Sequence, residues 1–220
     1  MIEFSLAQGT QPKCILFLGA HCDDIEIGCG GTILTLVEKC PQTRIVCVTL
    51  SSDPLRAQET RDATSRLLEG ARSSEIIVGT FKGSYFPYIG DVIKDYIEQI
   101  KISHQPDVIF THRRHDLHQD HRITNELTWN TFRDHLILEY EITKYDGDIS
   151  VPNTYVPLTR AQMRRKTDIL MECFPSQHKR QWFTRDTFEA IARIRGIECN
   201  ASEGYAEAFF GRKIRLSFGR

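Results

Sequence analysis

Two short clusters of histidine and aspartate stand out in the sequence because their side chains can bind a metal ion. The first, "AHCDD", covers residues 20–24 and directly follows an apolar run, and the second, "HQDH", covers residues 118–121. Imidazole nitrogens and carboxylate oxygens form a ligand set that suits divalent zinc with a position left open for water. A further carboxylate beside such a water can accept its proton. Together these residue types predict the metal site of a hydrolase.

His21, Asp24 and His121 are the candidate metal ligands. His21 and Asp24 are three residues apart in a turn that leads toward a predicted helix, so both side chains can face one point. Asp23 adjoins a ligand but should point in another direction, where it can act as a base. Taken alone, His21 could cap a helix, and the two aspartates could be carboxylates stabilised by a helix dipole. The second cluster, which follows another strand, favours the metal site.

The apolar runs of the sequence predict the strands that place these clusters. Four runs rich in branched apolar residues indicate buried strands: 14–19, 45–50, 75–78 and 108–111. Stretches with helical spacing alternate with them: 31–39, 54–68 and 91–102. This alternation predicts an α/β fold, a Rossmann-like three-layer sandwich around a mostly parallel sheet. Ligands of such sheets bind beyond the carboxyl ends of the strands, and both clusters lie there.

The rest of the chain gives weaker signals. Further elements are predicted in this order: a helix after His121 to about residue 134, a strand at 136–142, a loop rich in Gly, Pro, Asp and Asn at 143–159, and a helix at 159–171. Near the C-terminus Tyr205, Glu207 and Phe209 alternate, which fits a two-faced strand, a supporting loop or a wall of the site.

Three glycines after the first strand raise the alternative of a dinucleotide-binding site. Gly28, Gly30 and Gly31 follow a strand and open a helix, but they lack the G-x-G-x-x-G spacing. No convincing ribose-binding acid follows the second strand, although Asp53 lies nearby. The glycines are therefore interpreted as permitting a tight turn and close helix packing.

The sequence resembles the LmbE-like, or PIG-L, family of zinc-dependent de-N-acetylases, which remove acetyl groups from N-acetylglucosamine-type sugars. "AHCDD" is close to the family's A-H-P-D-D, and "HQDH" matches its H-x-D-H. "DIEIGCGGTI" after the first motif, "RAQETRDATSRLL" and "YAEAFF" add to the resemblance. Two spaced motifs in the right strand context are more specific than either motif alone.

The resemblance implies the composition of the metal site. His21, Asp24 and His121 would be the zinc ligands, and Asp23 would be the general base. The metal site would lie at the carboxyl ends of the strands. Zn²⁺ is the expected cofactor, and another divalent metal such as Fe²⁺ is an alternative.

The resemblance also implies roles for three residues that do not bind the metal. His118, in its protonated form, would stabilise the oxyanion or assist protonation of the leaving group. Asp120 would orient a histidine or stabilise its positively charged form. Arg56, which opens the helix after the second strand, looks like the family's substrate-contacting arginine. It could equally pair with Glu59 or Glu26.

The activity implied by the resemblance is hydrolysis of the N-acetyl group of an amino sugar, with release of acetate and a free amine. The sugar could be a glycoside, a nucleotide sugar or a glycolipid, and a homo-oligomer is expected. Two alternatives remain open. One is a sugar N-deformylase or other amidase with the same metal centre, and the other is a nucleotide-sugar-binding module without catalysis.

Some positions near the clusters depart from the pattern or receive no role. Cys22 stands where the family usually has proline, which removes a restraint on the turn and places a soft donor beside the metal. Its side chain should point away from its neighbours, so it is not assigned as a ligand. No role is assigned to Asp116. His104, His112 and His115 are predicted to be loop or surface histidines.

Length and composition narrow the class of protein. With 220 residues and 25.3 kDa, the chain predicts a single domain covering residues 1–220. A net charge of −1 gives no general attraction for nucleic acid. No apolar run approaches the ~20 residues that a membrane span requires. Seven cysteines without a C-x-x-C pair, and an N-terminus without signal-peptide features, predict a cytoplasmic protein.

Overall fold

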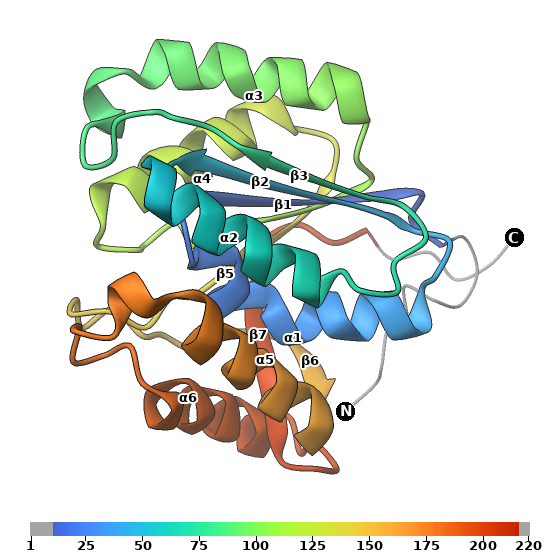
Figure 1. Ribbon diagram of the computed structural model, residues 1–220. Coiled ribbons are helices and arrows are strands. Elements are labelled where there is room, and N and C mark those ends of the chain that lie inside the picture. Colours follow the sequence, from blue (N-terminus) through green and yellow to red (C-terminus); the bar gives the residue numbers. More distant parts are fainter. Residues whose placement is uncertain (1–10, 216–220) are drawn as a thin grey trace, which may run out of the picture.

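The computed structural model describes residues 11–215, which fold around one β-sheet (Figure 1). In this part of the chain the sheet has seven strands in the order β3-β2-β1-β4-β5-β7-β6. Their bounds are β1 Cys14–His21, β2 Arg44–Ser51, β3 Ser74–Val78, β4 Val108–His112, β5 Leu136–Tyr140, β6 Thr154–Leu158 and β7 Tyr205–Gly211. Strands β1 to β5 are parallel, whereas β7 is antiparallel to β5 and β6 is antiparallel to β7. The sheet is mostly parallel, as predicted.

Helices cover both faces of the sheet and complete three layers (Figure 1). They are α1 Asp24–Lys39, α2 Pro54–Leu67, α3 Gly90–His104, α4 Gln119–Thr131, α5 Arg160–Cys173 and α6 Arg185–Glu198, with the 3-10 helices η1 Phe86–Tyr88 and η2 Pro175–Gln177. Ile15 and Phe17 of β1 pack with α1, α2, α5 and α6. Leu16 and Leu18 pack with α3 and α4 on the other face, because successive strand residues point to opposite sides. The predicted three-layer α/β sandwich is confirmed.

None of the helices within residues 11–215 is both long enough and apolar enough to cross a membrane.

The five predicted strands agree with β1 to β5 to within two residues at each end. Continuous apolar runs mark these strands because the sheet is covered on both faces, so nearly every side chain of β1, β2 and β4 is buried. The strands that place the two clusters are therefore the part of the fold that the sequence predicts best.

Helix α1 begins at Asp24, seven residues before the predicted start at residue 31, so the predicted tight turn at the glycines is wrong. The first half of α1 is buried on all sides and lacks the polar face that marks an ordinary surface helix. The predicted close packing is present. A Cβ atom at Gly28 would overlap the ring of Tyr140, and one at Gly31 would overlap Leu158.

Three further elements differ from the prediction. Helix α4 begins at Gln119 and includes His121, after which it was expected to start, because His118 serves as its N-cap. Strand β6 forms inside the predicted loop 143–159, although Pro157 lowers its strand propensity. This is tolerated because β6 is the edge of the sheet and pairs only with β7. Helix α6 follows a Thr184 N-cap and was not predicted.

A buried glutamate in α1 makes the stability of the fold depend on pH. Glu26 is 1% exposed, its Oε1 accepts a hydrogen bond from the Thr64 hydroxyl, and its Oε2 has no hydrogen-bond partner among the described residues. Burial raises the pKa of Glu26 from 4.5 to about 7. Between these pH values the unfolded chain releases this proton while the folded chain keeps it. This group therefore destabilises the fold progressively as the pH rises through that range.

Replacing Glu26 with glutamine is expected to remove this pH-dependent loss of stability. At about pH 8 the variant should be more stable than the parent by up to ~3 kcal/mol, and the difference should disappear below about pH 4.5. Urea unfolding of the metal-free protein at several pH values measures this. Glu172, whose side chain is 61% exposed, provides the matched control as Glu172→Gln. A Glu26→Gln gain that does not vary with pH would contradict the assignment.

Candidate metal centre

The two histidine and aspartate clusters lie beyond the carboxyl ends of neighbouring strands. β1 lies between β2 and β4, so the order of the sheet reverses at β1, the place where α/β sheets commonly bind ligands. β1 ends at His21, and β4 leads through residues 113–118 into α4. Because β1 and β4 are parallel neighbours, both ends lie at the same edge of the sheet. This topology brings together side chains that are about a hundred residues apart in the sequence.

The three predicted metal ligands converge. The Nδ1 atom of His21 lies 3.2 Å from Nε2 of His121 and 3.5 Å from Oδ2 of Asp24. The Nε2 atom of His121 lies 3.5 Å from Oδ1 of Asp24. Asp24 and His121 are buried and His21 is partly exposed, so the group opens to solvent on one side. Two imidazole nitrogens and one carboxylate thus face a common point.

Each of the two histidines contacts a carboxylate through the ring nitrogen that is not directed at the other predicted ligands. Nε2 of His21 lies 2.9 Å from Oδ2 of Asp120, and Nδ1 of His121 lies 3.0 Å from Oδ2 of Asp116. Such contacts fix the orientation of a ring and leave its other nitrogen for a metal. Burial and the charge of His112 lower the pKa of His121 to about 4, which keeps this ring neutral. Asp120 therefore lies where a histidine-orienting residue was predicted, and Asp116 was missed.

The carboxylates around His21 stabilise a positive charge at the centre. Burial lowers the pKa of His21, but hydrogen bonds to Asp120 and Asp24 outweigh burial and raise this pKa to about 10. Burial acts to raise the pKa of Asp24, but the charges of His121 and His112 hold it well below its usual range. A metal ion would face Asp24 in place of a proton on Nδ1 of His21, and Nε2 of His21 would keep its contact with Asp120.

Asp23 occupies a strained position beside the predicted ligands. Its φ angle of 93° lies in the left-handed region, which costs energy for a residue other than glycine and is concentrated at functional sites. The Oδ2 atom of Asp23 lies 3.0 Å from Nη2 of Arg56. Burial raises the pKa of Asp23 to about 8, although the charge of Arg56 acts to lower it. A carboxyl group that titrates near neutrality is suited to accept and return a proton.

His118 lies beside both predicted histidine ligands, with ring centroids 4.8 Å from His21 and 4.6 Å from His121. The backbone N–H of Asp120 donates to Nδ1 of His118, so a neutral ring carries its proton on Nε2. Burial lowers the pKa of His118, and the charge of His21 lowers it further. The geometry favours a neutral Nε2–H donor over the protonated ring that the resemblance implied.

Arg56 is held by groups of the protein. Its Nη2 donates to the Cys22 carbonyl and pairs with Asp23, and its Nε lies 3.4 Å from Oε2 of Glu59. Glu59 also accepts hydrogen bonds from the backbone N–H and the hydroxyl of Ser176, at 2.9 and 2.6 Å. Arg56 therefore pairs with Glu59, one of the two acids that the sequence suggested. Its role as a substrate contact remains a prediction.

His112 belongs to the cluster, and its assignment as a loop or surface histidine is wrong. It is fully buried as the last residue of β4, and its Nε2 lies 3.1 Å from Oδ2 of Asp24. Its ring stacks on His121 with centroids 3.8 Å apart. Donor atoms of Asp24, His112 and His121 all lie within 4.8 Å of one another, so His112 could also help to hold a metal. The sequence signal that could have identified His112 as a site residue is its place at the end of a strand, which it shares with His21.

Cys22 is kept away from the metal centre. The residue is buried, and its thiol donates a hydrogen bond to the Ser51 carbonyl, with Sγ 3.6 Å from that oxygen. Burial raises the pKa of the thiol to about 12, so it stays protonated at neutral pH and is a poor metal ligand. The structure agrees with its exclusion from the ligand set.

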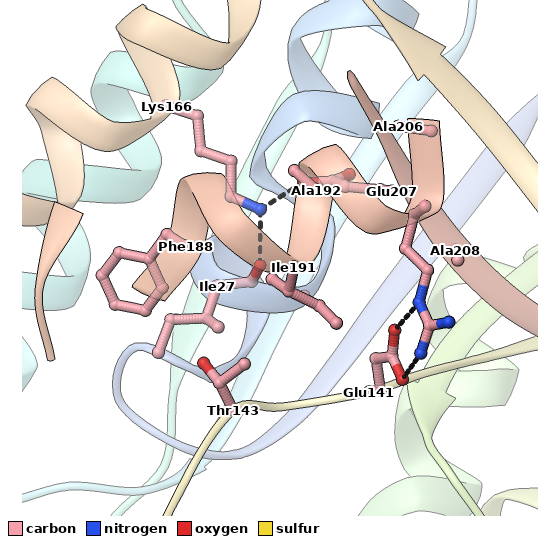
Figure 2. A pocket seen from close by; sticks show the side chains of 12 residues that line it. Ile27, Glu141, Thr143, Lys166, Phe188, Ile191, Ala192, Ala206, Glu207 and Ala208 are labelled. Carbon is pink, nitrogen blue, oxygen red and sulfur yellow. Dashed lines mark hydrogen bonds and ion pairs between the residues drawn. The ribbon is translucent and has the colours of Figure 1, made fainter. Parts of the chain in front are cut away.

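A buried ion pair beside the middle of α1 explains the alternating residues near the C-terminus. They form strand β7, and Glu207 points inward, where its carboxylate accepts hydrogen bonds from the N–H groups of Gly31 and Thr32. Lys166 donates to Glu207 and to the Ile27 carbonyl, both at 2.6 Å (Figure 2). The adjoining cavity has a volume of about 30 Å³, and no predicted site residue lines it. Glu207 therefore supports α1 and does not line the metal centre.

Comparison with known proteins identifies the family that shares these motifs. The family model of PIG-L, described as GlcNAc-PI de-N-acetylase, matches residues 16–132. No curated protein matches the chain. The matched segment covers more than half of the 220 residues and includes both clusters of histidine and aspartate.

Solved structures share the fold at low sequence identity. The N,N'-diacetylchitobiose deacetylase from Pyrococcus horikoshii is 21% identical, with a TM-score of 0.66, over 91% of this chain and 84% of that chain. The 4-carboxy-2-hydroxymuconate hydratase GalB from Pseudomonas putida KT2440 is 15% identical, with a TM-score of 0.75, over 94% and 99%. The A40926 pseudoaglycone deacetylase Dbv21 is 14% identical, with a TM-score of 0.69, over 90% and 96%.

At these identities the neighbours show the fold alone, and the presence of a hydratase among them indicates that the fold serves more than one reaction. The family match, in contrast, is carried by the sequence and spans both clusters. The chain belongs to the PIG-L family, the family of GlcNAc-PI de-N-acetylases.

Proposed function

We propose that this protein is a zinc-dependent hydrolase that removes the N-acetyl group from an N-acetylated amino sugar. The observation that carries the proposal is the convergence of His21, Asp24 and His121 in a chain of a de-N-acetylase family, with Asp23 adjacent to them. The deacetylases among the structural neighbours support the same class of reaction.

The residues present fit a divalent cation. Two imidazole nitrogens and a carboxylate face one another at 3.2 to 3.5 Å, an arrangement of electron-rich atoms that a cation stabilises. This donor set is typical of catalytic zinc, and Fe²⁺ accepts the same ligands. When bound, the cation supplies Lewis acidity to the attacking water and to the amide carbonyl.

Side chains of the protein carry the protons of the reaction. Asp23 accepts a proton from the attacking water as the new C–O bond forms. The Nε2–H of His118 donates to the amide oxygen as negative charge develops there, which is typically worth ~3 kcal/mol. Asp23 then returns the proton to the nitrogen as the C–N bond breaks. Acetate and a free amine leave.

A panel of acetamido sugars tests the proposed reaction. The zinc-loaded protein is expected to release acetate and free amine in equal amounts from at least one of four forms of N-acetylglucosamine: the free sugar, a simple glycoside, a nucleotide sugar and a glycolipid. N-formyl analogues of the same compounds separate a deacetylase from a deformylase. Acetate and primary amine are quantified independently, so that both products are measured.

Metal-free protein provides the control for this experiment. Removal of the metal with a chelator should abolish product release, and added zinc should restore it. Zinc-loaded protein that releases neither acetate nor formate from any member of the panel would contradict the proposal. Tight binding of a nucleotide sugar without product release would favour the non-catalytic alternative.

A further inference from the structure

Four buried charges connect the loop that follows β5 to the metal centre. Arg113, Asp116, Lys144 and Asp148, here called the Asp116 cluster, expose only 1–9% of their side chains. Arg113 and Asp116 follow β4, whereas Lys144 and Asp148 belong to the loop 141–153. The ends of these parallel neighbouring strands lie at one edge of the sheet. The charges of two cationic side chains and two carboxylates thus cancel in a region for which the sequence suggested no function.

Asp116 contacts two of the predicted site histidines with its two oxygens. Oδ2 lies 3.0 Å from Nδ1 of His121, and Oδ1 accepts a hydrogen bond of 2.8 Å from the backbone N–H of His118. The first contact fixes the rotation of a predicted metal ligand, and the second fixes the start of α4. One carboxylate therefore orients both a predicted ligand and the predicted oxyanion donor.

Lys144 connects this carboxylate to the loop 141–153. Its Nζ lies 3.2 Å from Oδ2 of Asp116, the same oxygen that faces His121, and 2.7 Å from Oδ2 of Asp148. Asp148 also accepts a hydrogen bond from the backbone N–H of Leu117 and pairs with Arg113. The loop is thus fixed at two points to the segment that carries His118.

We propose that Asp116 is a positioning residue for His118 and His121, and that Lys144, acting through Asp116, makes the loop 141–153 a part of the metal centre. The inference rests on the metal centre of the proposed function. An Asp116 carboxylate without Lys144 would be a buried charge missing one of its partners, and it would turn away from His121 to find water. Loss of Lys144 should therefore weaken metal binding although Lys144 touches no predicted ligand.

Zinc affinity of the metal-free protein tests this directly, by competition with a chromophoric chelator. Asp116→Asn keeps only one acceptor oxygen, whereas the two oxygens of Asp116 contact His118 and His121. The substitution should therefore raise the zinc Kd by about 10–100-fold. Lys144→Met should raise it by about threefold or more, and Lys144→Arg should restore the parent value. If Lys144 acts through Asp116, the double variant should match Asp116→Asn alone to within about twofold.

A role that is only structural would give other results. Urea unfolding of each metal-free variant is measured in parallel, with Lys94→Met as the control, since Lys94 forms an ion pair with Glu98 on α3 away from this cluster. An unchanged zinc Kd in Asp116→Asn or Lys144→Met, with a loss of stability alone, would overturn the inference. Effects of the two substitutions that multiply in the double variant would also overturn it.

These outcomes can be separated from failure of the proposed function. A parent protein that binds zinc but releases no acetate overturns the proposed reaction alone, and the zinc affinities of the variants still decide the inference. A parent protein that binds no divalent cation overturns both.

Discussion

Asp23→Asn is expected to lower kcat by about 10²–10⁴-fold while the protein keeps its zinc. The asparagine side chain has nearly the same shape but cannot take a proton from the attacking water. Oδ2 of Asp23 pairs with Arg56 at 3.0 Å, and Asp23 is not one of the predicted ligands, so its loss should leave the ligand set intact. Zinc content per chain and steady-state turnover of the best substrate in the panel measure the two effects separately.

Asp24→Asn is the matched comparison because it makes the same chemical change at the next residue. Asp24 faces both His21 and His121, so loss of its charge should weaken zinc binding itself. The zinc Kd should rise by more than the ~10–100-fold that is typical when a residue that only orients a metal ligand is replaced. The turnover of Asp24→Asn should recover partly when zinc is in excess, and that of Asp23→Asn should not. Equal loss of zinc from both variants would refute this division of roles.

Glu207→Ala is expected to lower the free energy of unfolding by about 3–5 kcal/mol. The substitution leaves Lys166 as a buried unpaired cation and removes the acceptor of the Gly31 and Thr32 backbone N–H groups. Lys166→Met should cost less, because the Glu207 carboxylate keeps three other donors, including the Thr32 hydroxyl. Urea unfolding of the metal-free protein measures these losses.

The neighbouring ion pair of α5 provides the control for this prediction. Arg165 pairs with Glu69 at 2.9 Å, but the side chains are 45% and 78% exposed. Arg165→Met should therefore change the free energy of unfolding by less than about 1 kcal/mol. A loss in Glu207→Ala as small as that of Arg165→Met would show that the buried pair does not stabilise α1.

The predicted site residues could be found from the sequence because they are grouped along the chain at strand ends. His21, Asp23 and Asp24 follow one apolar run, and His118 and His121 follow another. A parallel sheet places such ends at one edge, so a coarse assignment of strands was enough to predict that the clusters meet.

The partners of these residues could not be predicted, because they depend on the direction of single side chains. The predicted strand ended at residue 111, whereas β4 runs one residue further, and His112 is its last residue and is buried like the rest of the strand. Asp116 and Lys144 lie in segments without any periodic pattern, and only the folded chain shows that they touch.

Strand β6 and the start of helix α1 depart from the prediction, and the reasons are physical. Strand β6 is an edge strand that contains Pro157, and it exists because β7 pairs with it. Helix α1 was placed too late because glycines lower helix propensity, whereas contacts with Tyr140 and Leu158 require glycine there. In both cases tertiary contacts outweigh the local preference of the sequence.

The pairing of Glu207 with α1 has a consequence for the order in which the chain folds. Its carboxylate and the Gly31 N–H are separated by 176 residues, so this contact closes one of the longest loops in the described chain. During synthesis the whole of the HQDH motif leaves the ribosome long before residue 207 does. The nascent chain therefore contains every predicted zinc ligand before it contains Glu207. Until then, helix α1 lacks the carboxylate that accepts hydrogen bonds from the N–H groups of its middle turn.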